Sequence, residues 1–237
     1  MTATEILIIA AVTIAGSIIH GTTGIGLGLV AGPALLSVDP KFVPGPILLA
    51  SMIVGVRHIV VEWRTTDRNI LRRLCFGLPF GTAAALIILT TVNERVMAIC
   101  IGALVILASA ALLGGFEFSR TPRNEVVGGA AASFGAVAAA LPGPPLVMAL
   151  HDTPGPVLRP TISLVNALIS AVGMVGLALV GLFGWAELQL LALLTPFVLI
   201  GLFLARFVRP WLDRSFFRPT VLCLSLAGGA ALLFSNL

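Results

Sequence analysis

The sequence predicts an all-α polytopic membrane protein with two inverted-topology repeats, each a broken or re-entrant helical hairpin followed by three transmembrane helices. Composition predicts the class: the 237-residue chain is 58% hydrophobic and 10% charged, and its mean hydropathy is +1.10. These values lie far outside the range of soluble domains. The repeat follows from a second observation, because glycine and proline interrupt one apolar run in a similar way in each half.

Apolar runs bounded by charged or turn-forming residues divide the chain into candidate segments. They cover residues 4–20, 23–38, 43–62, 71–91, 96–115, 126–141, 144–151, 157–181, 187–206 and 217–235. A membrane-spanning helix needs about 20 apolar residues at about 1.5 Å rise each. The runs 23–38 and 144–151 are shorter than this, and both lie beside the glycine and proline interruptions. The segments 4–38 and 126–151 are therefore predicted to be broken hairpins, aligned on Gly32-Pro33 and Gly143-Pro144.

Arginine placement predicts the topology, because short cytoplasmic loops carry an excess of Lys and Arg. Four loops contain most of the arginines and are placed inside: 62–73, 116–125, 151–159 and 206–218. Two loops with a single arginine between them are placed outside: 92–95 and 182–187. The first hairpin then starts and returns on the outer side and the second on the inner side. This opposite entry is an inverted-topology repeat, and both termini are expected on the outer side of the plasma membrane.

We expect one transmembrane domain with an N-terminal repeat at 1–115, a cytoplasmic linker at 116–124 and a C-terminal repeat at 125–237. The N-terminal segment contains Glu5 and no basic region, so the first span is expected to be retained rather than cleaved. The formal net charge of +4 comes from arginines scattered between apolar runs, which argues against a nucleic-acid partner. The cysteines lack metal or redox spacing and are interpreted as packing residues: Cys75, Cys100 and Cys223.

Paired interruptions in corresponding places of two halves indicate a transporter's binding site. Glycine and proline persist at membrane depth where the freed backbone groups find protein, water or a ligand. Helix starts at these breaks would present N–H groups and a positive dipole end, which favour an anion. The residues expected at the two half-helix starts are Thr22, Thr23 and Gly24 in the first half and Pro142, Gly143 and Pro144 in the second.

The glycines of the first interruption also allow a structural interpretation. Gly24, Gly28 and Gly32 recur at intervals of four, which predicts a stripe of small residues for close helix packing. A dinucleotide-binding interpretation of the GxG spacing is excluded, because the strand and acidic residue that it requires are missing from this membrane run. The same stripes could also serve contacts between copies of the chain.

Other polar residues within apolar runs are candidates for the substrate path. Arg57 lies about 7 Å from the inner end of its span, where it could supply a counter-charge or snorkel to the headgroups. His20, before the first break, could contact substrate or a proton, and His58 could do so or lie at the interface. Ser163, Asn166 and Ser170 share one helix face, which either lines a path or holds helices together.

These features resemble the TauE/SafE family of sulfite exporter-like permeases. The resemblance covers nearly the whole chain through its two-part architecture and the elements GTTGIGLGLVAGPALL and SFGAVAAALPGPP. It implies export of small sulfur-containing anions such as sulfite or sulfoacetate across the plasma membrane, and no metal or organic cofactor. Thr22 and Thr23 depart from the more glycine-rich first element that is typical of the family.

The sequence therefore predicts a transporter of a small anionic substrate that works by alternating access in the lipid bilayer. Two alternatives stay open. One is a transporter of a cation or transition metal, which would need carboxylates, His or Met at the breaks. The other is a non-transport membrane enzyme or assembly subunit using His151 and Asp152.

Overall fold

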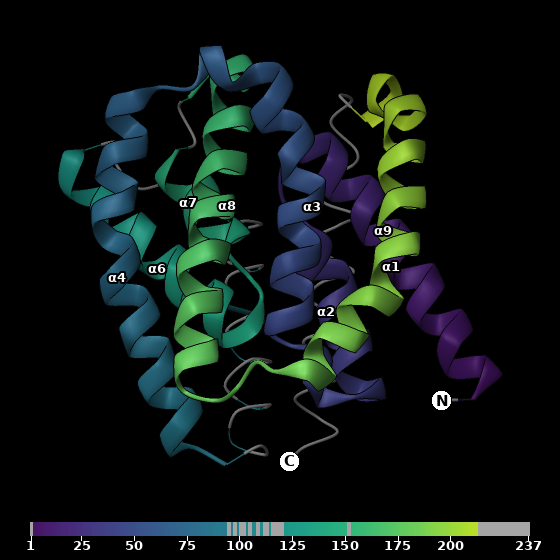
Figure 1. Ribbon diagram of the computed structural model, residues 1–237. Helices are drawn as coiled ribbons and strands as arrows, with labels where there is room; N and C mark the ends of the chain where they lie inside the picture. Colours follow the sequence, from purple (N-terminus) through teal and green to yellow (C-terminus); the bar gives the residue numbers. More distant parts are fainter. Residues whose placement is uncertain are drawn as a thin grey trace.

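The computed structural model describes residues 2–93, 121–150 and 153–212, with scattered positions between 96 and 114. Every regular element in this part is a helix, which confirms the predicted all-α class (Figure 1). The elements are α1 (Ala3–Thr23), α2 (Leu27–Val38), η1 (Pro40–Phe42), α3 (Gly45–Glu62), η2 (Trp63–Thr65), α4 (Arg68–Thr91), α6 (Pro122–Ala139), α7 (Gly143–Ala149), α8 (Gly155–Leu179) and α9 (Trp185–Leu212).

Within the described residues, four helical stretches are long and apolar enough to cross a membrane. They are Ala3–Thr23, Arg68–Thr91, Pro160–Leu179 and Trp185–Val208. The elements α2 and α7 fall short of a full span, as predicted from the short runs 23–38 and 144–151. Most of the linker 116–124, most of the run 96–115 and all of the run 217–235 lie outside the described residues.

Side-chain caps define the polar ends of three membrane helices. At the start of α1 the Thr2 hydroxyl accepts the Glu5 N–H at 3.3 Å, and the Glu5 carboxylate accepts the Thr2 N–H at 2.8 Å. The side chains of Asp67 and Thr121 likewise accept first-turn N–H groups, at the starts of α4 and α6. These caps satisfy N–H groups that a helix start leaves over. Glu5 is thus explained by its place at a helix start.

The directions of neighbouring helices follow from their contacts. In α4 and α6, Arg73 pairs with Glu125 and Gly81 packs on Ala130, so the two helices run side by side in the same direction. In α1 and α9, Gly201 packs on Ser17 near the middle of α1, and Gly21 packs on Ala205 farther along both helices, so these also run parallel.

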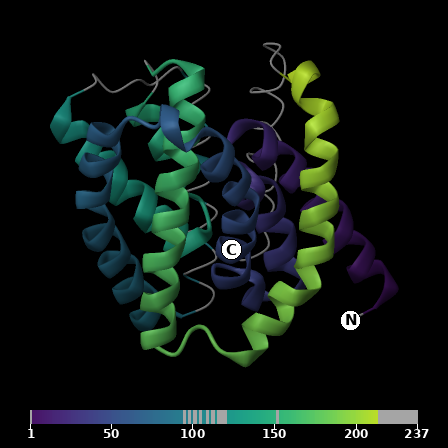
Figure 2. The same ribbon diagram turned by 45° about the horizontal axis from the view of Figure 1, so that its top comes forward.

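The central pair of helices runs antiparallel. The Ser170 hydroxyl of α8 donates to the Leu48 carbonyl of α3 at 3.2 Å, whereas Gly55 of α3 lies beside Ser163 of α8. Each hairpin packs on the fourth α-helix of the other half: α1 on α9, and α6 on α4 (Figures 1 and 2). The short connections from α3 to α4 and from α8 to α9 lie at opposite ends of the molecule, so α4 and α9 run in opposite directions (Figure 1). The two parallel pairs then place α1 and α6 in opposite directions, and the contacts above do the same for α3 and α8.

Glycines bring the paired helices to backbone contact. A Cβ on Gly77 or Gly81 would overlap the α6 backbone near Ala130, and a Cβ on Gly129 would overlap the α4 backbone at Leu74. The Thr82 and Ser133 hydroxyls complete this interface with a buried hydrogen bond of 2.7 Å. Small residues of this kind drive helix association in membranes, where lipid tails are as apolar as the side chains.

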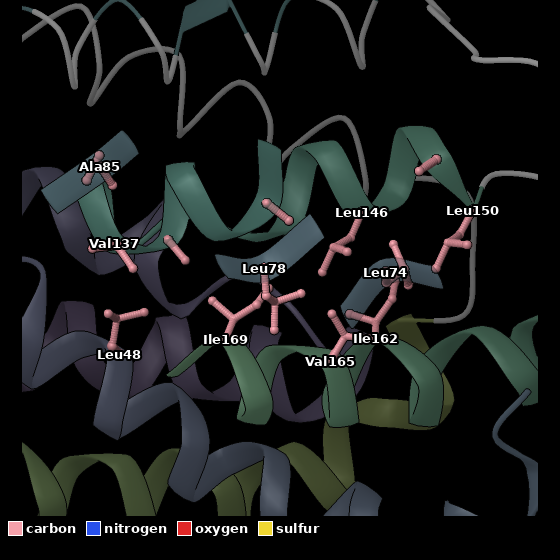
Figure 3. Packing of buried hydrophobic residues seen from close by; sticks show 14 of the residues in the cluster. Leu48, Leu74, Leu78, Ala85, Val137, Leu146, Leu150, Ile162, Val165 and Ile169 are labelled. Atoms are coloured by element: carbon pink, nitrogen blue, oxygen red, sulfur yellow. The ribbon is translucent and has the colours of Figure 1, made fainter. Parts of the chain in front are cut away.

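The buried apolar residues form two clusters, one on each side of the hairpin tips. One cluster joins α1, α2, α3 and α9 with the tip that follows α6. The other joins α4, α6, α7 and α8 and includes Leu78, Val137, Leu146 and Ile169 (Figure 3). In both, a hairpin is packed against helices of the other half, so the two halves share each of these clusters.

Candidate functional site

The first hairpin tip follows the last turn of α1. Gly24, in a left-handed conformation with φ of +86°, caps α1 by donating its N–H to the His20 carbonyl at 2.8 Å. The Thr22 and Thr23 hydroxyls donate back to the Ile19 carbonyl at 2.8 and 2.9 Å. The prediction that these residues cap the start of the next half-helix is therefore wrong. They end α1, because threonine hydroxyls bond readily to carbonyls one turn back.

The half-helix after this tip starts with backbone N–H groups that no N-cap side chain caps. Gly26, with φ of +128°, is the N-cap of α2 and makes no side-chain cap bond. The first helical bond of α2 runs from the Val30 N–H to the Gly26 carbonyl. The N–H groups of Leu27, Gly28 and Leu29 precede this bond and have no partner within the helix, as is general for the first turn of a helix. Together with the positive dipole end, they make this start attractive to an anion.

The second tip lies between α6 and α7 and has a different chemistry. Pro142 is the N-cap of α7, and Gly143 is its first residue, as predicted. Pro144 and Pro145 follow and have no N–H, so this start offers fewer donors than that of α2. Ala140 caps α6 in the left-handed region at φ of +56°, a strained conformation for a residue with a Cβ.

The alignment of the two interruptions on Gly32-Pro33 and Gly143-Pro144 is also wrong. Gly32 and Pro33 lie inside α2, whereas Gly143 begins α7. The residues that correspond by their place in the fold are the left-handed helix caps, Gly24 and Ala140. The predicted small-residue stripe is interrupted, because Gly24 lies outside α2. Among the described residues of other elements, no atom lies within 4 Å of a Cβ on Gly32, whereas a Cβ on Gly28 would meet the opposing tip. The packing role is confirmed for Gly28.

The two tips meet at Gly28. A Cβ there would overlap the Ala140 carbonyl oxygen, and a Cβ on Gly143 would lie 3.2 Å from the Ile25 side chain. Between the tips lies a cavity of about 10 Å³, enough for about one water. It is lined by His20, Ile25, Gly26, Gly28, Leu29, Ser51, Ala140, Leu141, Pro142 and Gly143. The structure thus brings His20 together with both predicted breaks.

The polar face of α8 lies at the level of this cavity. Leu48 of α3 contacts Ser170 and Gly55 contacts Ser163, so Ser51 and Asn166 lie at matching heights of the antiparallel pair. Asn166 is 1% exposed, and within the described structure neither atom of its amide has a hydrogen-bond partner. The Ser163 hydroxyl is also buried and has no hydrogen-bond partner among the described residues. Ser170 bonds to α3, which supports the helix-holding interpretation for that residue.

Several predicted residues lie outside the described part of the structure. The α3 backbone includes Arg57 and His58, but their side chains are not described, and nor is that of Pro144. His151 and Asp152, the pair of the enzyme alternative, lie wholly outside. Among the lining residues that the predicted site did not include, Ser51 has a polar side chain. Like Ser163, it lies on the first span after a hairpin, and this place in the sequence is the signal that could have identified it.

The arrangement places hydrogen-bonding groups beside the cavity: the first-turn N–H groups of α2, the Ser51 hydroxyl and the His20 imidazole, with the Asn166 amide at the same level. Within the part of the chain described here, no group of three His, Cys, Asp or Glu side chains could hold a metal ion. Backbone N–H groups at a helix start are suited to oxyanions. The described lining therefore supplies hydrogen-bond donors, which are the groups that a small anion requires.

Comparison with known proteins identifies the family. The sequence model of the family described as "Sulfite exporter TauE/SafE" matches residues 8–232, nearly the whole chain. The chain belongs to the TauE/SafE family. The resemblance found from the sequence is thereby confirmed, and this TauE/SafE protein is a multi-pass membrane protein of a family of transporters rather than enzymes. Neither the curated proteins nor the solved structures contain a significant match to it.

Proposed function

We propose that this TauE/SafE protein exports a small sulfur-containing oxyanion, such as sulfite or an organosulfonate, across the plasma membrane by alternating access. The observation that carries the proposal is the contact of two helix tips, one from each half, around a small cavity beside the α2 start. Sites at broken helices near the midplane are typical of secondary transporters. Both termini are proposed to lie outside, in keeping with the arginine-rich loops.

The proposal includes an inverted repeat of residues 1–115 and 125–237, joined by the cytoplasmic linker 116–124. The contacts that support it are those that make α1 and α6, α3 and α8, and α4 and α9 run in opposite directions. An inverted pair of halves has two related conformations, in which one half takes the arrangement of the other. Exchange between them exposes the site to each side in turn.

The packing of the described helices also suggests which parts move. The interface of α4 with α6 is closed by glycine contacts, the Thr82–Ser133 hydrogen bond and the Arg73–Glu125 ion pair at 3.0 Å. Glycine contacts close the interface of α1 with α9. We propose that these two pairs stay intact and that the tips separate. Each moving body would then combine the hairpin of one half with a helix of the other half, rather than being one of the two repeats.

Ligand size supports this movement. The cavity holds about one water, and an oxyanion such as sulfite is larger. The arrangement described here is therefore closed around the site, and the tips must separate to admit substrate. Thr22, Thr23 and Gly24 would contribute by holding the end of α1, and Pro142, Gly143 and Pro144 by shaping the opposing tip. Arg57 would supply the counter-charge, Ser163 and Asn166 hydrogen bonds, and His20 or His58 a proton or a substrate contact.

Membrane energetics favour export. With the cytosol negative, outward movement of one negative charge gains about 2.3 kcal/mol per 100 mV. Export can therefore proceed without a coupled ion, whereas import of the same anion would need one. The cation or metal alternative has less support, because the described residues around the tips offer donors of hydrogen bonds rather than carboxylates.

Transport by purified protein in lipid vesicles tests the proposal. Under an imposed potential, sulfite or sulfoacetate should move faster than through protein-free vesicles, and a metal cation should not. Cysteines at Thr82 and Ser133, in a chain without native cysteines, should form a disulfide that leaves transport unchanged. A disulfide between cysteines at Ile25 and Gly143 should block transport until it is reduced. If no anion moved faster than through protein-free vesicles, the proposed function would be refuted. If the disulfide between positions 82 and 133 blocked transport, the proposed moving bodies would be refuted.

A further inference from the structure

A groove on the outside of the α4 and α6 pair is separate from the tip cavity. Its volume is about 330 Å³, and its lining is Phe80, Gly81, Ala84, Ala130, Ala131, Phe134, Gly135, Leu141 and Pro145. No residue of this lining carries a polar side chain. A polar ligand would lose its hydrogen bonds with water on entry and gain none from side chains, so the groove suits hydrocarbon alone.

The position of the groove identifies the surroundings from which that hydrocarbon comes. Phe80 lies midway along α4, which is one of the membrane-crossing helices, and it is 74% exposed. The middle of a span faces the acyl chains of the bilayer. A water occupies about 30 Å³, and a methylene group is of similar size. The groove therefore has room for about eleven methylene groups, which is most of one lipid acyl chain.

The groove shares a wall with the tip cavity. Leu141 lines both spaces and is 3% exposed, and Pro145 at the start of α7 borders the groove on the same side. An empty groove would leave these residues without contacts on one face and forfeit their dispersion energy. A chain seated there supports the second tip from the membrane side.

We infer that this groove is a binding site for one acyl chain of a membrane phospholipid, which packs against Leu141 and supports the wall of the tip cavity. The inference depends on the membrane location of α4 and not on which anion is transported. Its effect on transport rests on the proposed function, so binding and flux are measured separately.

Two neighbouring alanines of α4 provide a matched pair of variants. Ala83 and Ala84 are both exposed, but only Ala84 lines the groove. Ala84→Trp fills the groove, whereas Ala83→Trp adds the same side chain to the bilayer surface beside it. Both positions face lipid, so neither change disturbs the buried interface of α4 with α6.

The test is photolabelling of the full-length protein in vesicles that contain phospholipid with a diazirine in the middle of one acyl chain. Labelling should be several-fold higher at Phe80 and Phe134 than at Phe203, which is exposed on α9 and is not among the residues that line this groove. Ala84→Trp should remove this excess and Ala83→Trp should keep it, with equal melting temperatures confirming that both fold.

Uniform labelling of exposed phenylalanines, or excess labelling that survives Ala84→Trp, would overturn the inference. So would displacement of the label by a long-chain alkylsulfonate at a concentration that saturates transport, because the groove would then hold the tail of a substrate. Loss of labelling without any change in flux would keep the lipid site and remove its effect on the tip. Absence of flux in all variants concerns the proposed function alone.

Discussion

Replacing Gly28 by alanine tests whether the contact between the two tips controls transport. A Cβ at this position overlaps the Ala140 carbonyl oxygen, and both partners are backbone, so only separation of the tips relieves the overlap. Gly32 lies one turn later in the same helix, and among the described residues of other elements no atom lies within 4 Å of a Cβ there. The same substitution therefore meets the opposing tip at one position and no described neighbouring element at the other.

The two substitutions are expected to change the free energy of unfolding by different amounts. Alanine is favoured over glycine within a helix by about 1 kcal/mol. At Gly32 this gain is opposed by the ring of Pro33, which disfavours a Cβ on the preceding helical residue, so Gly32→Ala should change the free energy of unfolding by less than about 1 kcal/mol. At Gly28, overpacking costs about 1–3 kcal/mol and exceeds the smaller propensity gain of a first-turn position. Gly28→Ala should lower the free energy of unfolding by up to about 2 kcal/mol and prevent the tips from closing.

The assay combines thermal unfolding in detergent with sulfite flux in vesicles. Gly28→Ala should lose flux at temperatures where it is still folded, whereas Gly32→Ala should transport like the unaltered protein and melt within a few degrees of it. Because the two variants differ only in what their methyl groups meet, equal flux in both would refute the role of the tip contact.

Three further predictions concern the site and the ends of the helices. Asn166→Leu should abolish flux with little loss of stability, because its buried amide has no hydrogen-bond partner among the described residues. Ser170→Ala should cost about 1 kcal/mol of stability and retain flux, as unfolding curves and vesicle assays would show. Arg73→Gln should lower the melting temperature more than Glu125→Gln, since the carboxylate is 1% exposed and the guanidinium 38%. Arg57→Ala should raise the anion concentration that gives half-maximal flux, and an unchanged value would remove Arg57 from the site.

Much of the fold could be predicted because membrane segments obey simple rules. Apolar runs located the described helices to within a few residues, and the short runs at 23–38 and 144–151 correctly indicated partial spans. The chemistry of the first tip could not be predicted as well. A polar residue beside a break can end one helix or start the next. Thr22 and Thr23 belong to the end of α1, because their hydroxyls donate to a carbonyl one turn back.

The glycine stripe failed for a related reason. A spacing of four places residues on one face only within a continuous helix, and Gly24 precedes the break at which that register is lost. Within α2, the sequence could not tell whether Gly28 or Gly32 meets a neighbour, because the neighbour is a tip more than a hundred residues away. Ser51 was missed as a lining residue because its height relative to the tips is set by the packing of α3 against α8.

The unequal chemistry of the tips bears on how an anion would move between the two sides. The start of α2 presents the N–H groups of Leu27, Gly28 and Leu29, whereas prolines replace two of the first donors of α7. Two halves that pack alike therefore do not bind alike. When the tips separate, hydrogen bonding favours retention of the anion by α2, and α7 would act as a movable cover. On this argument the hairpin of α1 and α2 carries the site, and the strained cap at Ala140 lies in the element that opens it.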